Sequence, residues 1–171
     1  VESRKNADGT YDTDIIQSLA LGGVTDGVTN MELCAAYATI ANGGEYTEPL
    51  YYTKVLDNSG KIILEREPER RQVLKESTAY ILTDAMHGVV TAGGTGTKAN
   101  LDNMYVAGKT GTTSNSYDIW FAGYTPYLTA TIWSGYDQNV LMDNTSYHLV
   151  IWKNIMSRVH ELKGYEYAEF K

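Results

Sequence analysis

The stretch "MYVAGKTGTTSNSYDIWFAGYTPYLTATIWSGY", Met104 to Tyr136, decides the fold class. It contains three runs, "MYVAGKTGTT", "DIWFAGYT" and "YLTATIWSGY", in which aromatic and β-branched residues favour strands. Short turn segments separate these runs, and Pro126 marks the second turn. Strands joined by short turns pair antiparallel, so this stretch predicts an antiparallel sheet.

Two segments upstream of these strands predict helices. In "VTNMELCAAYATIANGG", Thr29 and Glu32 have the spacing of a capping box, and Gly43-Gly44 supply a stop. The second segment begins near Ser77 with "STAYILTDAMHGVV" and ends near Gly93-Gly94. Its helical period puts four apolar side chains on one stripe: Ala79, Leu82, Met86 and Val89.

A third helix is predicted near the end of the chain, in "NTSYHLVIWKNIMSRVHELKG". Thr145 or Ser146 is the expected cap and Gly164 the expected stop. The apolar face of this helix comprises Leu149, Trp152, Met156 and Val159. Helices packed on an antiparallel sheet give an α+β fold, here as a single domain over residues 1–171.

Two further segments have simpler patterns. In "YYTKVLDNSGKIILERE", two β-prone runs flank Asp57-Asn58-Ser59-Gly60, which predicts a hairpin. Residues 1–14 are polar and rich in Gly and Asp, so we expect a loop or frayed end there.

Composition narrows the possible functions. The 171 residues are 43% hydrophobic and 20% charged, which is typical of a soluble globular domain. The formal charge of −7 argues against a nucleic-acid partner. No apolar run approaches the roughly 20 residues that span a bilayer, so we expect no membrane contact by this segment. Cys34 is the single cysteine, which excludes an internal disulfide and a cysteine-based metal cluster, and its apolar neighbours predict a packing role.

Lys109 belongs to two overlapping motifs that bind different anions. Gly108-Lys109-Thr110 has the form of the end of a phosphate-binding loop, but the first glycine of that motif would fall at Asn103 and no helix follows. Lys109-Thr110-Gly111-Thr112 instead offers a cation and hydroxyls on a strand, which suits a carboxylate. A solvated strand edge rich in Lys and Thr, without any function, stays open on the triplet alone.

Strand geometry constrains the carboxylate hypothesis. Alternation places Thr110 and Thr112 on one face of the strand and Lys109 and Gly111 on the other. The polar groups can act together if Lys109 curls around the strand edge, or if one hydroxyl binds a ligand and the other is structural. Gly111 has no side chain, so a ligand backbone can lie against the strand there.

The segment "GKTGTTSNSYDIWFAGYTPYLTATIWSGYD" closely resembles the third active-site motif of the penicillin-binding proteins, the serine D,D-transpeptidases. Upstream, "SLALGGVTDGVTNMELCAAYATIANGGEYTEPLYYTKVLDNSGKII" is similar to the segment that precedes this motif in the bifunctional class A members, which combine glycosyltransferase and transpeptidase domains. "TAYILTDAMHGVVTAGGTGTKA" resembles the helix and turn that lead to the strand. The resemblance covers most of Ser18 to Trp152 and implies the penicillin-binding/serine β-lactamase-like fold.

The resemblance also implies roles for the matching residues. Lys109, Thr110, Gly111 and Thr112 would form the site for the terminal carboxylate of a D-Ala-D-Ala stem peptide, or of a β-lactam that mimics it. The backbone N–H of Thr112 would supply one arm of an oxyanion hole, and Lys109 is also a candidate for proton transfer. Neither a cofactor nor a metal is expected.

Two motifs of the family are absent from the sequence. No serine is followed three residues later by lysine: Ser77 precedes Thr-Ala-Tyr and Ser157 precedes Arg-Val-His. A Ser-x-Asn motif is also absent. We therefore expect the chain to be the C-terminal part of one transpeptidase domain, with the preceding part as its necessary partner. Alone, it should neither form an acyl-enzyme nor turn over peptide.

Three functions remain open at this point. The leading one is a peptidoglycan transpeptidase, acting outside the cytoplasmic membrane and anchored through an N-terminal segment of the parent protein. The second is a D,D-carboxypeptidase or β-lactamase of the same fold. The third is a non-catalytic β-lactam sensor or a domain that binds cell-wall peptide.

The other chemically capable residues have plainer expected roles. Asp118 is expected to be a turn or ion-pair residue. The histidines are predicted to pack or lie on the surface: His87, His148 and His160. The aromatic run is predicted to be mostly core, with one ring able to rim the groove: Trp120, Phe121, Tyr124, Trp133 and Tyr136.

Overall fold

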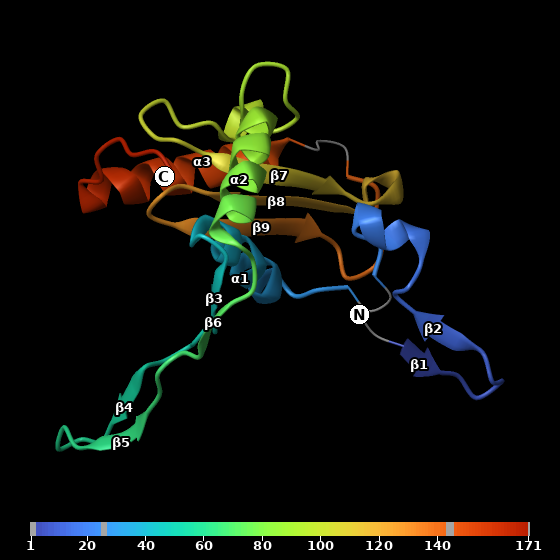
Figure 1. Cartoon of the computed structure of the whole chain (residues 1–171), viewed down its shortest axis with the longest axis horizontal. Helices are drawn as coiled ribbons and strands as arrows, with labels where there is room; N and C mark the ends of the chain where they lie inside the picture. Colours follow the sequence, from blue (N-terminus) through green and yellow to red (C-terminus); the bar gives the residue numbers. More distant parts are fainter. Residues whose placement is uncertain (1–2, 25–26, 143–145, 171) are drawn as a thin grey trace.

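The computed structural model of the chain describes residues 3–24, 27–142 and 146–170. Its centre is an antiparallel sheet with strand order β7-β8-β9 (Figure 1). The strands are β7 (Ala107–Thr112), β8 (Asp118–Tyr124) and β9 (Thr129–Gly135). The sheet predicted from the sequence is therefore confirmed.

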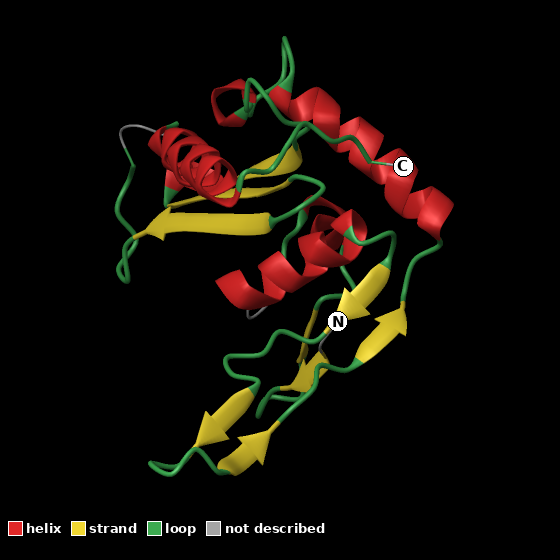
Figure 2. Ribbon diagram, turned by 90° about the vertical axis from the view of Figure 1, so that its left-hand side faces the viewer, coloured by secondary structure: helices red, strands yellow, loops and turns green. Residues whose placement is uncertain are grey.

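Helices cover both faces of this sheet (Figure 2). They are α1 (Asn30–Ala41), α2 (Glu76–Val90) and α3 (Tyr147–Lys163). On the α3 face, the rings of Phe121 and Trp152 meet edge to face with centroids 5.1 Å apart. On the α1 face, Tyr124 packs against Tyr37 with centroids 6.5 Å apart. The α+β prediction is confirmed, because the sheet is buried between helices.

Local sequence explains how these helices begin and end. Thr29 and Glu32 form the predicted capping box, since each side chain accepts from the other residue's backbone N–H. Gly164 ends α3 in the left-handed conformation, with φ 65°. Ser146 precedes α3 without a side-chain capping bond, and Thr145 lies outside the described residues.

The buried stripe of α2 differs from the predicted one. Ala79 and Met86 are buried as expected, but Leu82 is 39% exposed, while Thr83 and Val90 are buried. The buried face of the helix includes Thr83, whose hydroxyl hydrogen bonds to the Tyr124 hydroxyl at 2.9 Å. A buried polar pair is thus part of the face on which α2 meets the sheet.

An extended arm projects from the body between α1 and α2 (Figure 1). At its tip, β4 (Lys54–Leu56) and β5 (Ile62–Glu65) form the predicted hairpin, whose turn is held by the Asp57 carboxylate accepting from Ser59 and Lys61 amides. At its base, β3 (Glu45–Thr47) pairs with β6 (Arg70–Gln72). That pairing was not predicted, because the two strands are short, polar and distant in sequence.

The expectation of a loop or frayed end over residues 1–14 was wrong for the described part. Strands β1 (Ser3–Lys5) and β2 (Tyr11–Thr13) form an antiparallel hairpin. The turn forms because the Asp8 carboxylate accepts from the backbone and hydroxyl of Thr10, and Gly9 supplies φ 87°. Residues 1 and 2 lie outside the described residues.

Candidate functional site

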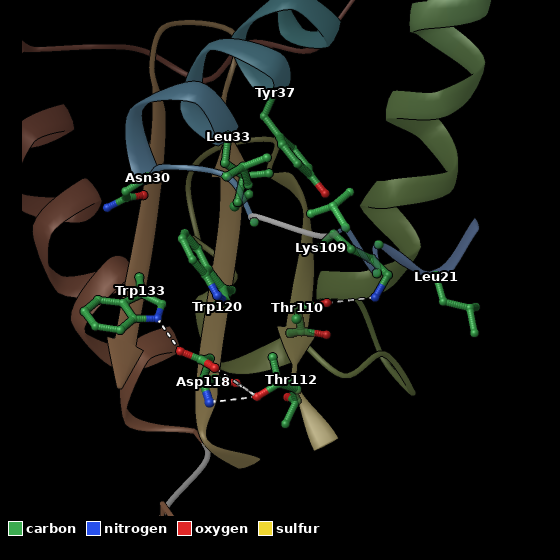
Figure 3. Close-up of a pocket in the computed structure, with 18 residues that line it drawn as sticks. Leu21, Asn30, Leu33, Tyr37, Lys109, Thr110, Thr112, Asp118, Trp120 and Trp133 are labelled. Carbon is green, nitrogen blue, oxygen red and sulfur yellow. Dashed lines mark hydrogen bonds between the residues drawn. The ribbon is translucent and has the colours of Figure 1, made fainter. Parts of the chain in front are cut away.

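A pocket of about 750 Å³ opens beside the second half of β7 (Figure 3). Its floor is formed by β7 and β8, and one wall by Trp133 of β9 together with the first residues of α1. An apolar wall is supplied by residues 21–24 and 27–28, beginning at the last residue of a 3₁₀ turn, Gln17–Leu21. All four predicted site residues line it: Lys109, Thr110, Gly111 and Thr112.

The strand register defines which side chains share the pocket face. Lys109 lies opposite Ala122, and Gly111 opposite Trp120. Paired residues in an antiparallel sheet project to the same side, so Lys109 and Gly111 share a face with Ala122 and Trp120. Alternation along the chain puts the Thr113 hydroxyl on the same face. The predicted alternation is confirmed, and Thr110 and Thr112 lie on the other face.

The structure resolves how residues from both faces reach one pocket. The Lys109 ammonium turns to the outer edge of β7 and donates to the Thr110 carbonyl oxygen at 2.9 Å. The Thr110 hydroxyl hydrogen bonds to the Thr95 hydroxyl at 2.8 Å, so it also anchors the loop after α2. Thr112 is exposed at the strand end. Lys109 and the Thr112 hydroxyl are therefore the polar side chains most open to a ligand.

Backbone groups of β7 are also directed toward this edge. The Thr113 N–H donates to the Asp118 carbonyl across the turn at 3.0 Å, so it points toward β8. Backbone groups of a strand alternate in direction, which turns the N–H groups of Thr110 and Thr112 away from β8. No strand pairs with that outer edge within the described part of the chain. The Thr112 N–H is thus available to a ligand lying along β7.

A compact set of hydrogen bonds closes the end of the pocket. The Asp118 carboxylate accepts from the Trp133 indole N–H at 2.9 Å and from the Thr113 hydroxyl at 3.2 Å. The same hydroxyl accepts from the Asp118 N–H at 2.9 Å. Asp118 is thus confirmed as a turn residue. Thr113 was not predicted as a site residue from the sequence. Strand alternation, which places Thr113 on the same face as Lys109, was the signal that could have identified it.

The prediction that the aromatic run is mostly core is confirmed for only two of its five residues. Phe121 and Tyr124 are fully buried, while Tyr136 is 57% exposed. Two rings, not one, border the pocket: Trp120 and Trp133, with centroids 6.3 Å apart. Burial raises the pKa of Tyr124 to about 12, so this phenol stays protonated and can bond to Thr83.

The histidines have packing roles and lie outside the pocket lining. The His87 Nδ1 lies 2.7 Å from the Val106 carbonyl oxygen, and the ring stacks on Tyr105. His148 and His160 are buried, and burial lowers the pKa of His148. Across residues 3–24, 27–142 and 146–170, no three His, Cys, Asp or Glu side chains are arranged to hold a metal ion.

Two other predictions concern Cys34 and the membrane. Cys34 is half-buried on α1, and its thiol donates to the Thr129 carbonyl of β9 at 3.8 Å, which is a packing role. None of the helices in the described residues has the length and apolar character to cross a bilayer.

Comparison with known proteins connects this geometry to a family. Residues 3–158 match the family described as the penicillin binding protein transpeptidase domain. The chain is 40% identical over 152 residues to penicillin-binding protein 1A of Clostridium botulinum, covering 88% of the chain and 18% of that protein. It is 42% identical over 146 residues to penicillin-binding protein 1A of Clostridium acetobutylicum, covering 85% of the chain and 18% of that protein.

Solved structures support the same fold. The D,D-transpeptidase domain of a peptidoglycan glycosyltransferase from Eggerthella lenta superposes with a TM-score of 0.67 at 28% identity, over 80% of this chain and 33% of that one. Penicillin-binding protein 1A from Haemophilus influenzae gives 0.71 at 22% identity, over 90% of this chain and 29% of that one. The chain spans about a fifth of the length of its curated relatives. It belongs to the penicillin-binding protein transpeptidase domain family.

Proposed function

We propose that this chain carries the carboxylate-binding strand of a peptidoglycan D,D-transpeptidase that is also a target of β-lactams. The observation that carries the proposal is the shared outer edge of β7, where the Lys109 ammonium and the outward N–H of Thr112 border one pocket. The edge supplies a cation for a terminal carboxylate. A few residues along, it supplies a donor for a carbonyl oxygen.

The reaction assigns a separate task to each group. A serine outside this sequence attacks the carbonyl carbon between the two D-Ala residues of a stem peptide, and the Thr112 N–H stabilises the oxyanion. The C–N bond breaks and D-Ala leaves with the proton taken from the serine. An amine of a second stem peptide then attacks the ester, forming the cross-link and releasing the serine. With a β-lactam, the ring amide opens to the same kind of ester.

Lys109, with the Thr110 and Thr112 hydroxyls, holds the substrate carboxylate until the C–N bond breaks and that carboxylate leaves with D-Ala. The Lys109 ammonium is exposed, and its bond to the Thr110 carbonyl can be exchanged for a ligand at small cost. A hydrogen bond to a charged group contributes about 1.5–3 kcal/mol. At about 1.4 kcal/mol per tenfold change, that is roughly 10- to 150-fold in the rate of acylation at low ligand concentration.

The isolated chain is expected to be inactive, because it has no Ser-x-x-Lys motif. Its necessary partner is the part of the domain that carries this motif, in a parent protein anchored outside the cytoplasmic membrane. The same pocket would serve a D,D-carboxypeptidase, which transfers the acyl group to water. The description of the family that the chain matches, the penicillin binding protein transpeptidase domain, favours the transpeptidase.

Fluorescent penicillin is the direct test, applied to the longer protein that contains this chain. The Lys109→Met variant keeps the aliphatic stem and removes the cation, so it should label roughly 10- to 150-fold more slowly. Lys98→Met is the matched control, because the Lys98 ammonium donates to Ser146 and does not line the pocket. Equal labelling rates for the two variants would contradict the proposal, as would stoichiometric covalent labelling of the isolated chain.

A further inference from the structure

The turn between β7 and β8 is held by more hydrogen bonds than a short exposed loop requires. Thr113 and Asp118 are joined by the Thr113 N–H to the Asp118 carbonyl and by the Asp118 N–H to the Thr113 hydroxyl. That hydroxyl in turn donates to the Asp118 carboxylate at 3.2 Å, with the Asp118 carbonyl oxygen 3.5 Å away. The first two bonds are 3.0 and 2.9 Å long. These contacts form the last rung between the strands.

The residues inside the turn have an unusual backbone conformation. Asn115 and Ser116 have φ values of 61° and 53°, and they are the only non-glycine residues with positive φ among the described residues. Side chains make this left-handed conformation uncommon. The Ser116 N–H donates back to the Thr113 carbonyl at 2.9 Å, so the turn closes on the residue that Asp118 holds. The Thr113–Asp118 pair thus holds a turn in which Ser116 has a conformation that is uncommon for a residue with a side chain.

The Thr113–Asp118 pair is adjacent to the backbone N–H of Thr112, the proposed donor to the oxyanion. Thr112 directly precedes Thr113, and its N–H is directed outward because the strand pairing on one side of it and the Thr113 N–H to Asp118 bond on the other turn the neighbouring N–H groups toward β8. Thr112 is exposed, and no strand pairs with its outer side within the described residues. The direction of the Thr112 N–H is therefore held, on the side of the turn, by the rung that Asp118 completes.

Asp118 also holds a wall of the pocket. Its second carboxylate oxygen accepts from the Trp133 indole at 2.9 Å, across the diagonal of the β8–β9 pair (Figure 3). Trp133 is 39% exposed, so packing alone does not fix its ring. One carboxylate thereby connects the end of β7 to an indole that borders the same pocket.

We propose that Asp118 is a positioning residue for acylation, which acts through Thr113 on the direction of the Thr112 N–H and through Trp133 on the pocket wall. This inference rests on the proposed function. Asp118 does not touch the reacting atoms. Its effect is to keep the oxyanion donor aligned while the carboxylate site at Lys109, at the other end of the edge, is left unchanged.

The test separates binding from chemistry in the longer protein, with penicillin as the probe. Stopped-flow acylation gives the dissociation constant of the first complex and the first-order acylation rate constant. Asp118→Ala and Thr113→Val should each lower the rate constant by about 10- to 100-fold, the effect of a small misplacement of a catalytic group. The dissociation constant should change by less than about threefold, because the Lys109 cation is unaffected.

Three matched variants accompany them. Thr113→Ser keeps the hydroxyl and should restore most of the rate. Trp133→Phe keeps a ring but removes the indole donor, and should cause a smaller loss of rate. Asp102→Ala removes an exposed carboxylate that pairs with Lys153 at 3.7 Å outside the pocket, and should change nothing. The double variant of Asp118 and Thr113 should be no slower than the slower single variant, because both act through one rung.

A purely structural role would give a different result. Misfolding lowers the fraction of protein that is acylated but leaves the rate constant of the remaining molecules unchanged. That outcome for Asp118→Ala would overturn the inference, and so would additive losses in the double variant. If the unmodified protein is not acylated at all, the proposed function fails first, and this inference with it.

Discussion

Gly108 lies in β7, opposite Gly123 of β8 and one residue before Lys109. Its replacement by alanine should be severely destabilising. A methyl group placed there would lie 2.7 Å from the Ala122 carbonyl oxygen, 2.9 Å from the Gly123 Cα and 2.8 Å from the Phe121 ring. Two of these three atoms belong to the backbone of the paired strand, so relief requires the strands to separate. Overpacking of a buried site costs about 1–3 kcal/mol, and more where the backbone must move. We expect about 3 kcal/mol or more for Gly108→Ala.

Thermal unfolding of the longer protein, followed in the transition of its transpeptidase domain, measures this effect. A loss of about 3 kcal/mol corresponds to a fall in Tm of roughly 6–12 °C for a domain of 150–250 residues. Gly88→Ala, in the interior of α2, is the control, because a methyl group there would meet no described atom within 4 Å beyond the adjacent backbone of its own helix. That variant should gain about 0.5–1 kcal/mol from helix propensity. A Gly108→Ala protein as stable as the original would refute the reasoning about this contact.

Three further predictions concern stability. Burial lowers the pKa of His148 below its ordinary 6.5, so the unfolded state binds the proton more readily than the folded state. The free energy of unfolding, measured with urea, should therefore fall as the pH drops below about 6.5, and it should fall less in the His148→Met variant. Thr125→Val removes a buried hydroxyl that lies 2.9 Å from the His160 Nε2, and should cost about 1–3 kcal/mol in the same assay, whereas Thr125→Ser should cost less. Thr29→Ala breaks the capping box with Glu32 and should cost about 1 kcal/mol of stability. Amide hydrogen exchange in α1 should then be faster than in the unmodified protein, and slower exchange would contradict the prediction.

Local sequence signals predicted the central part of the fold. The β-branched and aromatic runs of β7, β8 and β9 needed only short turns to pair in order, so their sheet followed from the chain itself. The capping box before α1 and the glycine after α3 likewise act over a single turn of helix.

Features that depend on distant contacts were not predictable. The β3–β6 pair joins short polar segments about 25 residues apart, which carry no alternation of apolar residues. The buried face of α2 includes Thr83, whose hydroxyl finds its partner, Tyr124, on a different element. In each case the interaction that decides the geometry forms only when the tertiary structure brings the two groups together.

The candidate site divides in the same way. The motif identified Lys109, Thr110, Gly111 and Thr112, and all of them line the pocket. The link from Asp118 to Trp133 is a diagonal contact that exists in only one register of β8 and β9, so spacing along the sequence does not reveal it.

The most direct test of the central claim is a crystal structure of the longer protein acylated with benzylpenicillin. The account predicts the ligand in the pocket beside β7, with its carboxylate within hydrogen-bonding distance of the Lys109 ammonium and the Thr110 or Thr112 hydroxyl. The ester carbonyl oxygen should accept from the Thr112 N–H at about 2.7–3.1 Å. A penicilloyl group whose carboxylate is bound away from Lys109, with no contact to the outer edge of β7, would contradict it.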